Sequence, residues 1–152
     1  MNLTVGMKAP IFKLPSSSGE VVSLEDYLGS KVLIFFYPKD DTPGCTIEAC
    51  GIRDEHENIY RNGTVVFGIS PDDFDSHNSF IKKFDLNFEL LSDVDKTVST
   101  TYGAWGEKTL YGKKSIGMKR MSFLINEEGF ISKIWKKVIP DRHATQILEA
   151  IS

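Results

Sequence analysis

The segment Lys31-Val-Leu-Ile-Phe-Phe-Tyr37 continues directly into Pro38-Lys-Asp-Asp-Thr-Pro-Gly-Cys-Thr-Ile-Glu-Ala-Cys50. The first segment is the most apolar run in the chain and has no polar alternation, which is typical of a strand buried on both faces of a sheet. The second segment contains both cysteines of the protein, preceded by two prolines and a glycine. We therefore expect the two thiols to lie where a central strand passes into a helix.

The sequence on either side predicts an α/β fold with a central mixed sheet flanked by helices and an N-terminal β-hairpin. The expected strands are 11–14, 21–22, 31–37, 64–70, 88–91, 120–126 and 130–137. The expected helices are 45–62, 73–84, 95–102 and 140–151, with one helical turn at 24–28. Residues 103–117 contain four glycines and show no clear period. They are predicted to form the longest loop.

Composition excludes several classes of function. The 152 residues are expected to form one domain, 1–152, because this length can bury a core without disulfides. The net charge is −3 and the basic residues are interleaved with acidic ones, so neither nucleic acid nor an anionic membrane is an expected partner. The N-terminus lacks a secretory pattern and no apolar run approaches about 18 residues, so a cytoplasmic location is expected. In a reducing compartment, two cysteines favour metal binding or redox chemistry.

Cys45 and Cys50 are expected in the same helix, with Cys45 in its first turn. Unpaired backbone N–H groups and the partial positive charge of a helix N-terminus favour a thiolate there. A spacing of five residues rotates Cys50 by ~140° and separates the Cα atoms by ~8–9 Å, too far for a disulfide. A bond between them would require the helix to unwind around residues 46–51, where Gly51 lowers the cost. The alternative is that both cysteines are small apolar residues on different helix faces.

The segment Pro38 to Cys45 resembles the peroxiredoxin signature, which is a proline, three residues, a threonine, two residues and the peroxidatic cysteine. Its continuation to Cys50 resembles the Q-type subgroup, the bacterioferritin comigratory proteins, whose resolving cysteine lies in the same helix. Further segments are similar to that subgroup in order and spacing: Ser76-His77 with Phe80, Leu90-Leu-Ser-Asp93, Tyr102-Gly-Ala-Trp-Gly-Glu-Lys108, Tyr111-Gly112 and Gly117-Met-Lys-Arg-Met-Ser-Phe-Leu-Ile125. The resemblance covers nearly the whole chain. It departs at Ala104, Met121-Ser122 and Asn126-Glu-Glu128, none of them a catalytic position.

This resemblance implies a thioredoxin-like fold and a thiol peroxidase that reduces hydrogen peroxide and organic hydroperoxides. Cys45 would be the peroxidatic thiolate that becomes a sulfenic acid, and Cys50 the resolving thiol that forms an intramolecular disulfide with it. Thr42 would accept the thiol proton or hold the peroxide, and its alternative is a helix-capping threonine. Arg120 would donate charge-assisted hydrogen bonds to the thiolate and the peroxide. From the residues alone, Arg120 is one more cation at the start of a strand.

Pro38 and Glu48 are expected to line the substrate pocket. Pro38 would shield the thiolate from water, or it simply ends a strand. Glu48 lies three residues after Cys45 on the same helix face and would orient Arg120. The alternative for Glu48 is a solvated helix charge.

The histidines do not match the geometry of a catalytic base. His56 is expected to lie ~16 Å from Cys45 along the helix axis. His77 and His143 are interpreted as capping and surface residues. Two thiols five residues apart, with no paired Cys or His nearby, also lack the ligand spacing of a zinc site, so neither metal nor cofactor is expected.

The sequence thus predicts a monomeric, cofactor-free peroxidase that is recycled by thioredoxin or a similar dithiol protein. A thiol–disulfide oxidoreductase is disfavoured, because such proteins use Cys-x-x-Cys and this chain has four residues between its cysteines. A non-enzymatic redox sensor, in which oxidation melts the helix and signals to a partner, remains an alternative.

Overall fold

In the computed structural model, which describes residues 3–151, β3 (Lys31–Phe36) is the central strand of a five-stranded sheet. β3 pairs in parallel with β4 (Thr64–Ser70), and β4 pairs in parallel with β5 (Glu89–Ser92). On its other side, β3 pairs antiparallel with β8 (Met121–Ile125), which pairs antiparallel with β9 (Ile131–Trp135). The predicted α/β class with a mixed central sheet is therefore confirmed.

Alternate side chains of β3 and its extension enter two hydrophobic cores, which explains the absence of polar residues after Lys31. Leu33, Phe35 and Tyr37 belong to the core on the helical face of the sheet. Val32, Ile34 and Phe36 belong to the core on the opposite face. Burial of one such side chain contributes roughly 1.5–3 kcal/mol, so a strand with two buried faces contributes strongly to the stability of the fold.

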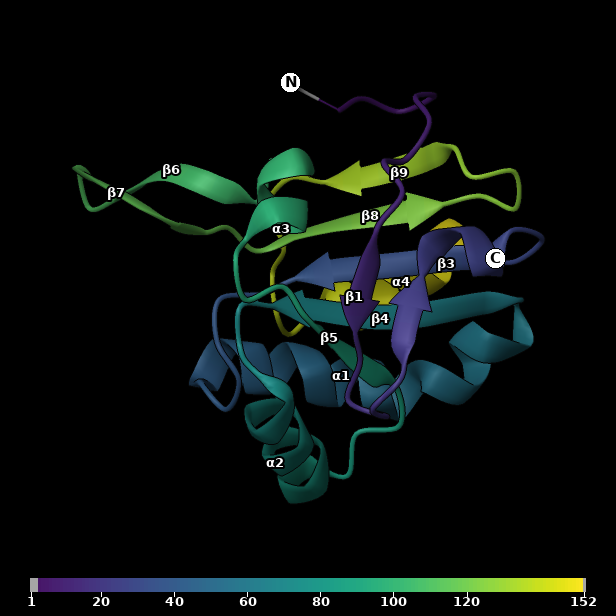
Figure 1. The fold of residues 1–152 in the computed structure, drawn as a ribbon, viewed down its shortest axis with the longest axis horizontal. Coiled ribbons are helices and arrows are strands. Elements are labelled where there is room, and N and C mark those ends of the chain that lie inside the picture. The colour runs from purple at the N-terminus through teal and green to yellow at the C-terminus, as the bar shows by residue number, and fades with distance from the viewer. Residues whose placement is uncertain (1–2, 152) are drawn as a thin grey trace.

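Three helices pack into the first core: α1 (Pro43–Arg61), α2 (Phe74–Phe84) and α4 (His143–Ile151). The second core is covered by the predicted N-terminal hairpin, formed by β1 (Lys13–Pro15) and β2 (Val21–Ser23), by the short 3-10 helix η1 (Leu24–Tyr27), and by the segment around α3 (Thr97–Thr101). Figure 1 shows β1 in front of the sheet and α4 behind it. Among residues 3–151, no helix is long and apolar enough to cross a bilayer.

The prediction of a loop at 103–117 is wrong. This region forms a two-stranded hairpin of β6 (Trp105–Leu110) and β7 (Lys113–Met118), which projects from the rest of the molecule (Figure 1). Tyr111 and Gly112 connect the strands with φ of 53° and 77°, and a two-residue hairpin turn with both residues in this region matches the strand twist. The turn is difficult to recognise in the sequence because its first residue is Tyr rather than the usual Asn or Asp.

Two other predictions are corrected near the C-terminus and on α2. The last helix begins at His143 rather than Pro140, because a turn in which the Arg142 N–H donates to the Ile139 carbonyl precedes it. His77 and His143 are both fully buried, so their interpretation as capping and surface residues is wrong. His77 lies one helical turn before Phe80, and its side chain therefore faces the core with that ring.

The carboxyl ends of β3, β4 and β5 meet at one edge of the sheet, as parallel strands require. The loop between β3 and α1, residues 37–42, emerges at this edge beside the loop between β4 and α2. This edge is where open α/β sheets place their ligands, and it is where the fold positions Cys45.

Candidate active site

The first turn of α1 presents Cys45 at the end of the loop that follows β3. Pro43 occupies the first turn, where its missing N–H costs no hydrogen bond, and Thr42 is the residue before the helix. The Thr42 hydroxyl donates a hydrogen bond of 2.8 Å to the Lys39 carbonyl, so its lone pairs stay free to accept. Cys45 itself is only 1% exposed. The structure therefore places Cys45 in the first turn of a helix, as predicted, and shows that its thiol is buried.

Arg120 reaches Cys45 from the segment just before β8, 75 residues further along the chain. Its Nη1 donates to the Cys45 Sγ at 3.3 Å and to the Glu48 Oε1 at 2.9 Å. A Cβ at position 44 would lie 3.0 Å from Arg120 Nη2, which is why a glycine stands beside the guanidinium. The arrangement brings together three of the predicted site residues around one sulfur atom.

Glu48 is buried beneath this guanidinium, with 1% of its surface exposed, so its interpretation as a solvated helix charge is wrong. Burial raises the pKa of Glu48 to about 7, against the opposing effect of its hydrogen bond and charge interaction with Arg120. Its second oxygen, Oε2, has no hydrogen-bond partner among the residues described. A carboxyl group with this raised pKa can accept from Arg120 Nη1 whether it is protonated or ionised.

Cys50 lies in the next turn of the same helix and is half-buried. α1 is continuous from residue 43 to residue 61, and neither cysteine forms a disulfide. The structure therefore does not bring the two thiols together. A Cβ at Gly51 would lie 3.8 Å from the Cβ of Ala144, so α4 packs against the turn that would have to unwind.

The other predicted residues lie in the same loop. Pro38 follows Tyr37 at the end of β3 and is half-buried, and Thr42 is also half-buried. Sequence reasoning missed Asp40, between these two residues, whose buried carboxylate contacts His77 on α2. The spacing of His77 from Phe80 on a helix face could have indicated a buried histidine, but no pattern in the sequence pairs it with Asp40.

A model of the AhpC/TSA family matches residues 5–134 of the chain. A relative from Coxiella burnetii (strain RSA 493 / Nine Mile phase I), named putative peroxiredoxin bcp, is 51% identical over 148 residues. These residues cover 97% of this chain and 98% of the relative.

Solved structures of similar proteins cover the chain almost completely. Peroxiredoxin Q from Xanthomonas campestris matches with a TM-score of 0.90 and 32% identity, over 97% of this chain and 96% of that chain. The bacterioferritin comigratory protein of Xanthomonas campestris, studied for its alkyl peroxide reduction activity, also matches with a TM-score of 0.90 and 32% identity, over 97% of both chains. The expectation of a thioredoxin-like fold is confirmed by these matches.

Proposed function

The chain belongs to the AhpC/TSA family and, within it, to the Q-type or bacterioferritin comigratory peroxiredoxins, and we propose that Cys45 is the thiol that reduces its peroxide substrates. Membership makes the protein a peroxidase that acts through a thiol. The observation that carries the assignment to Cys45 is its contact with Arg120, a permanent cation 3.3 Å from the sulfur. The proposed substrates are hydrogen peroxide and organic hydroperoxides, which the alkyl peroxide activity of the Xanthomonas campestris relative supports.

In the first step, the Cys45 thiolate attacks one peroxide oxygen and the O–O bond breaks. Sulfur is oxidised to a sulfenic acid, and the leaving oxygen takes a proton to become water or an alcohol. Arg120 has further N–H groups to donate to the peroxide oxygens while Nη1 holds the sulfur. Thr42 offers a hydroxyl to the substrate, Pro38 limits the access of water, and Glu48 orients Arg120.

In the second step, Cys50 attacks the Cys45 sulfenic acid, forming an S–S bond and releasing water. This step requires the first turns of α1 to unwind, because the helix keeps the two thiols apart. A dithiol protein, thioredoxin or one similar, then reduces the disulfide and is itself oxidised by two electrons. Such recycling needs a reducing compartment, and we therefore place the protein in the cytoplasm.

The test is to titrate the reduced protein with hydrogen peroxide while counting free thiols and measuring intact mass, and then to add thioredoxin, its reductase and NADPH. We expect both thiols to disappear with a loss of two hydrogens per chain and no covalent dimer, followed by sustained NADPH oxidation. Sedimentation in the same buffer checks the proposal that the protein is a monomer.

Cys50→Ser separates the two steps. This variant should still react once with peroxide, but it should stop at the sulfenic acid or proceed to the sulfinic acid, which mass spectrometry distinguishes. Normal turnover of Cys50→Ser with thioredoxin would show that the resolving role is wrongly assigned. A single oxidation of the wild-type protein without turnover would favour a redox sensor over an enzyme.

A further inference from the structure

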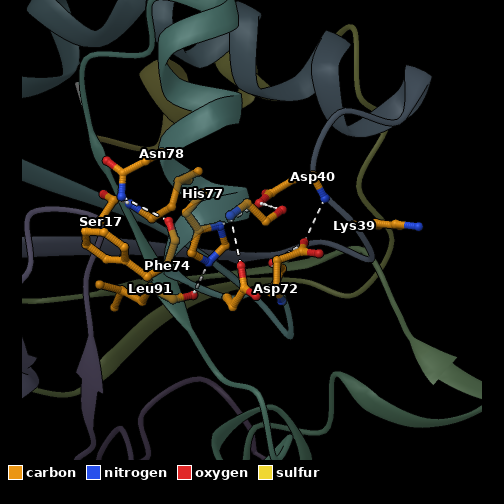
Figure 2. A network of polar contacts seen from close by, with 12 residues as sticks. Ser17, Lys39, Asp40, Asp72, Phe74, His77, Asn78 and Leu91 are labelled. Carbon is orange, nitrogen blue, oxygen red and sulfur yellow. Dashed lines mark hydrogen bonds and ion pairs between the residues drawn. The ribbon is translucent and has the colours of Figure 1, made fainter.

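A second polar network lies beside the active-site loop, buried between the ends of β3 and β4, the start of α2 and β5. His77 Nδ1 lies 2.8 Å from Asp40 Oδ2, and His77 Nε2 lies 3.0 Å from the carbonyl oxygen of Leu91. The side chains of His77 and Asp40 are 0% and 3% exposed. Figure 2 shows this network, from which the side chain of Lys39 points away.

The partners of His77 determine how many protons the pair holds. The Leu91 carbonyl can only accept, so His77 Nε2 carries a hydrogen. A second proton must lie between Nδ1 and Asp40 Oδ2, because a neutral nitrogen and a carboxylate oxygen at 2.8 Å would otherwise face each other with lone pairs alone. The pair is therefore neutral as a whole, with its charges matched inside the core, where a lone charge is costly.

Asp40 is held at its backbone as well as at its carboxylate. Its N–H donates to Asp72 Oδ2 at 2.8 Å, and Asp72 accepts a further hydrogen bond from Ser70. The hydroxyl groups of Tyr37 and Ser76 also donate to the Asp40 carboxylate. This single loop residue is thus bonded to elements on three sides.

Both carboxylate oxygens of Asp40 and both ring nitrogens of His77 have protein partners. Asp40, Asp72 and His77 lie close enough to suggest a metal site, but His77 Nδ1 and Asp40 Oδ2 are in direct hydrogen-bond contact. Each of these three residues has a protein partner for its buried polar atoms. The network is therefore better explained as a set of hydrogen bonds that holds the loop to α2 and the sheet than as a metal site.

Asp40 lies between two residues that are proposed to contact or shield the peroxide. Pro38 is two positions before Asp40, and Thr42 is two positions after it, immediately before the helix that carries Cys45. The next residue, Asp41, adopts a left-handed φ of 57°, which aspartate tolerates better than most residues other than glycine. The hydrogen bonds to the backbone N–H and the carboxylate of Asp40 hold the residue just before this turn of the backbone.

We propose that Asp40 and His77 are positioning residues of the peroxide step, which lock the loop of Pro38 and Thr42 to α2 and β5 while the neighbouring turns of α1 unwind and rewind. The proposal rests on the proposed function, because it gives the loop a substrate to position. It divides the site into a fixed part, residues 37–42, and a moving part that contains Cys45 and Cys50. The bonds of the network lie in the strands, the loop and α2 and need not break when α1 opens.

The test compares His77→Gln, Asp40→Asn and the double variant. Stopped-flow tryptophan fluorescence measures the second-order rate of Cys45 oxidation by hydrogen peroxide, and the following first-order phase measures disulfide formation. Each single variant should slow the peroxide step by about 10- to 100-fold, since a displacement of about 1 Å at a reacting group costs this much. The disulfide phase should change less than threefold. The peroxide rate constant of the double variant should exceed that of each single variant by at least a third of the difference between that single variant and the wild type. The reason is that the double variant removes both charges, whereas a single variant leaves one charge buried without its partner.

Lys83→Met is the matched control. Lys83 lies on the same helix and forms an ion pair with Asp41 of the same loop, but both side chains are exposed, and such pairs contribute little. Its peroxide rate should stay within twofold of the wild type. An equal loss in this control would overturn the role of the buried network.

Other outcomes are equally decisive. Single variants that melt at lower temperature but keep the wild-type peroxide rate, measured well below their melting temperatures, would show that the network is only structural. If His77→Gln does not fold, Ser76→Ala removes one donor to Asp40 and should still slow the peroxide step more than the disulfide step. In wild-type protein labelled with ¹⁵N, the ring Nε2 of His77 should carry a hydrogen; a His77 ring without a hydrogen on Nε2 would refute the proton count. A wild-type protein that does not react with peroxide would instead refute the proposed function.

Discussion

Replacing Glu48 with glutamine should make the protein more stable at alkaline pH, even though it removes one side of an ion pair. Glu48→Gln keeps the size of the side chain and an oxygen that accepts from Arg120 Nη1, but it cannot ionise. Glu48 is buried, and its Oε2 finds no hydrogen-bond partner in the described part of the chain. Ionising this carboxyl therefore costs more than the hydrogen bond and charge interaction with Arg120 recover.

The size of the effect follows from the pKa of about 7 in the folded protein, against 4.5 as the ordinary value. A carboxyl group whose pKa is raised by folding contributes its full stabilisation at pH values below its ordinary pKa of 4.5, and this contribution is lost as the pH rises through 7. Between pH 4 and pH 9, Glu48 should therefore cost the native state about 3 kcal/mol, at 1.36 kcal/mol for each pH unit of the difference. The glutamine variant should not show this loss.

The assay is urea unfolding at half-unit steps from pH 4 to pH 9, with Cys45→Ser as the background so that thiol ionisation beside Arg120 plays no part. The difference in unfolding free energy between this background and its Glu48→Gln derivative should grow with pH in favour of glutamine. Its midpoint should lie between pH 4.5 and pH 7. Glu57→Gln, at an exposed position of the same helix, is the control for losing one carboxylate. A difference that stays constant with pH, or that favours glutamate more as pH rises, would refute the reasoning.

Three further predictions concern α1, which the proposed disulfide would require to unwind, the sheet and α4. Gly51→Ala should fit without a clash, because the added Cβ would lie 3.8 Å from Ala144. It should slow disulfide formation about fivefold, because alanine adds ~1 kcal/mol of helix stability. An unchanged rate of disulfide formation in stopped flow would mean that this turn does not unwind. Gly68→Ala should destabilise the protein by roughly 1–3 kcal/mol in urea unfolding, because its Cβ would lie 2.7 Å from the ring of Phe35, and a stable variant would contradict this packing. Burial lowers the pKa of His143 to about 4, so the stabilising contribution of the neutral ring is present above pH 6.5 and is lost as the pH falls toward 4. His143→Gln should not lose this contribution, which amounts to about 3 kcal/mol of unfolding free energy over the range. Unfolding free energies of variant and wild type that change in parallel with pH would contradict the prediction.

Much of the fold is readable from local pattern. The unbroken apolar run from Lys31 to Tyr37 predicts a doubly buried strand, and β3 enters two cores as expected. The helix predicted over 73–84 is α2, which begins at Phe74 after the N-cap Asp73. The Asp73 carboxylate accepts from the Ser76 N–H. The hairpin of β6 and β7 was missed because its strands carry charged residues on exposed positions and so lack a clear period.

The site is divided in the same way between local and long-range information. The neighbours of Cys45, the prolines, Thr42 and Gly44, are visible in one stretch, and so is the five-residue separation from Cys50 that keeps the thiols apart in a helix. That Arg120 belongs to this site was suggested only by resemblance to a family. From the residues alone, it was one cation among many.

The sequence by itself determined the strand, the loop, the helix and the position of the thiol in its first turn, because these depend on hydrophobic period, proline, glycine and spacing along the chain. Only the tertiary structure decided that Arg120 reaches the sulfur across 75 residues, that Glu48 is buried rather than solvated, and that His77 contacts Asp40 in the core. The physical reason is that charge, burial and hydrogen bonding depend on which distant segments the sheet brings together. The residues adjacent in the sequence do not indicate which distant segments will pack against them.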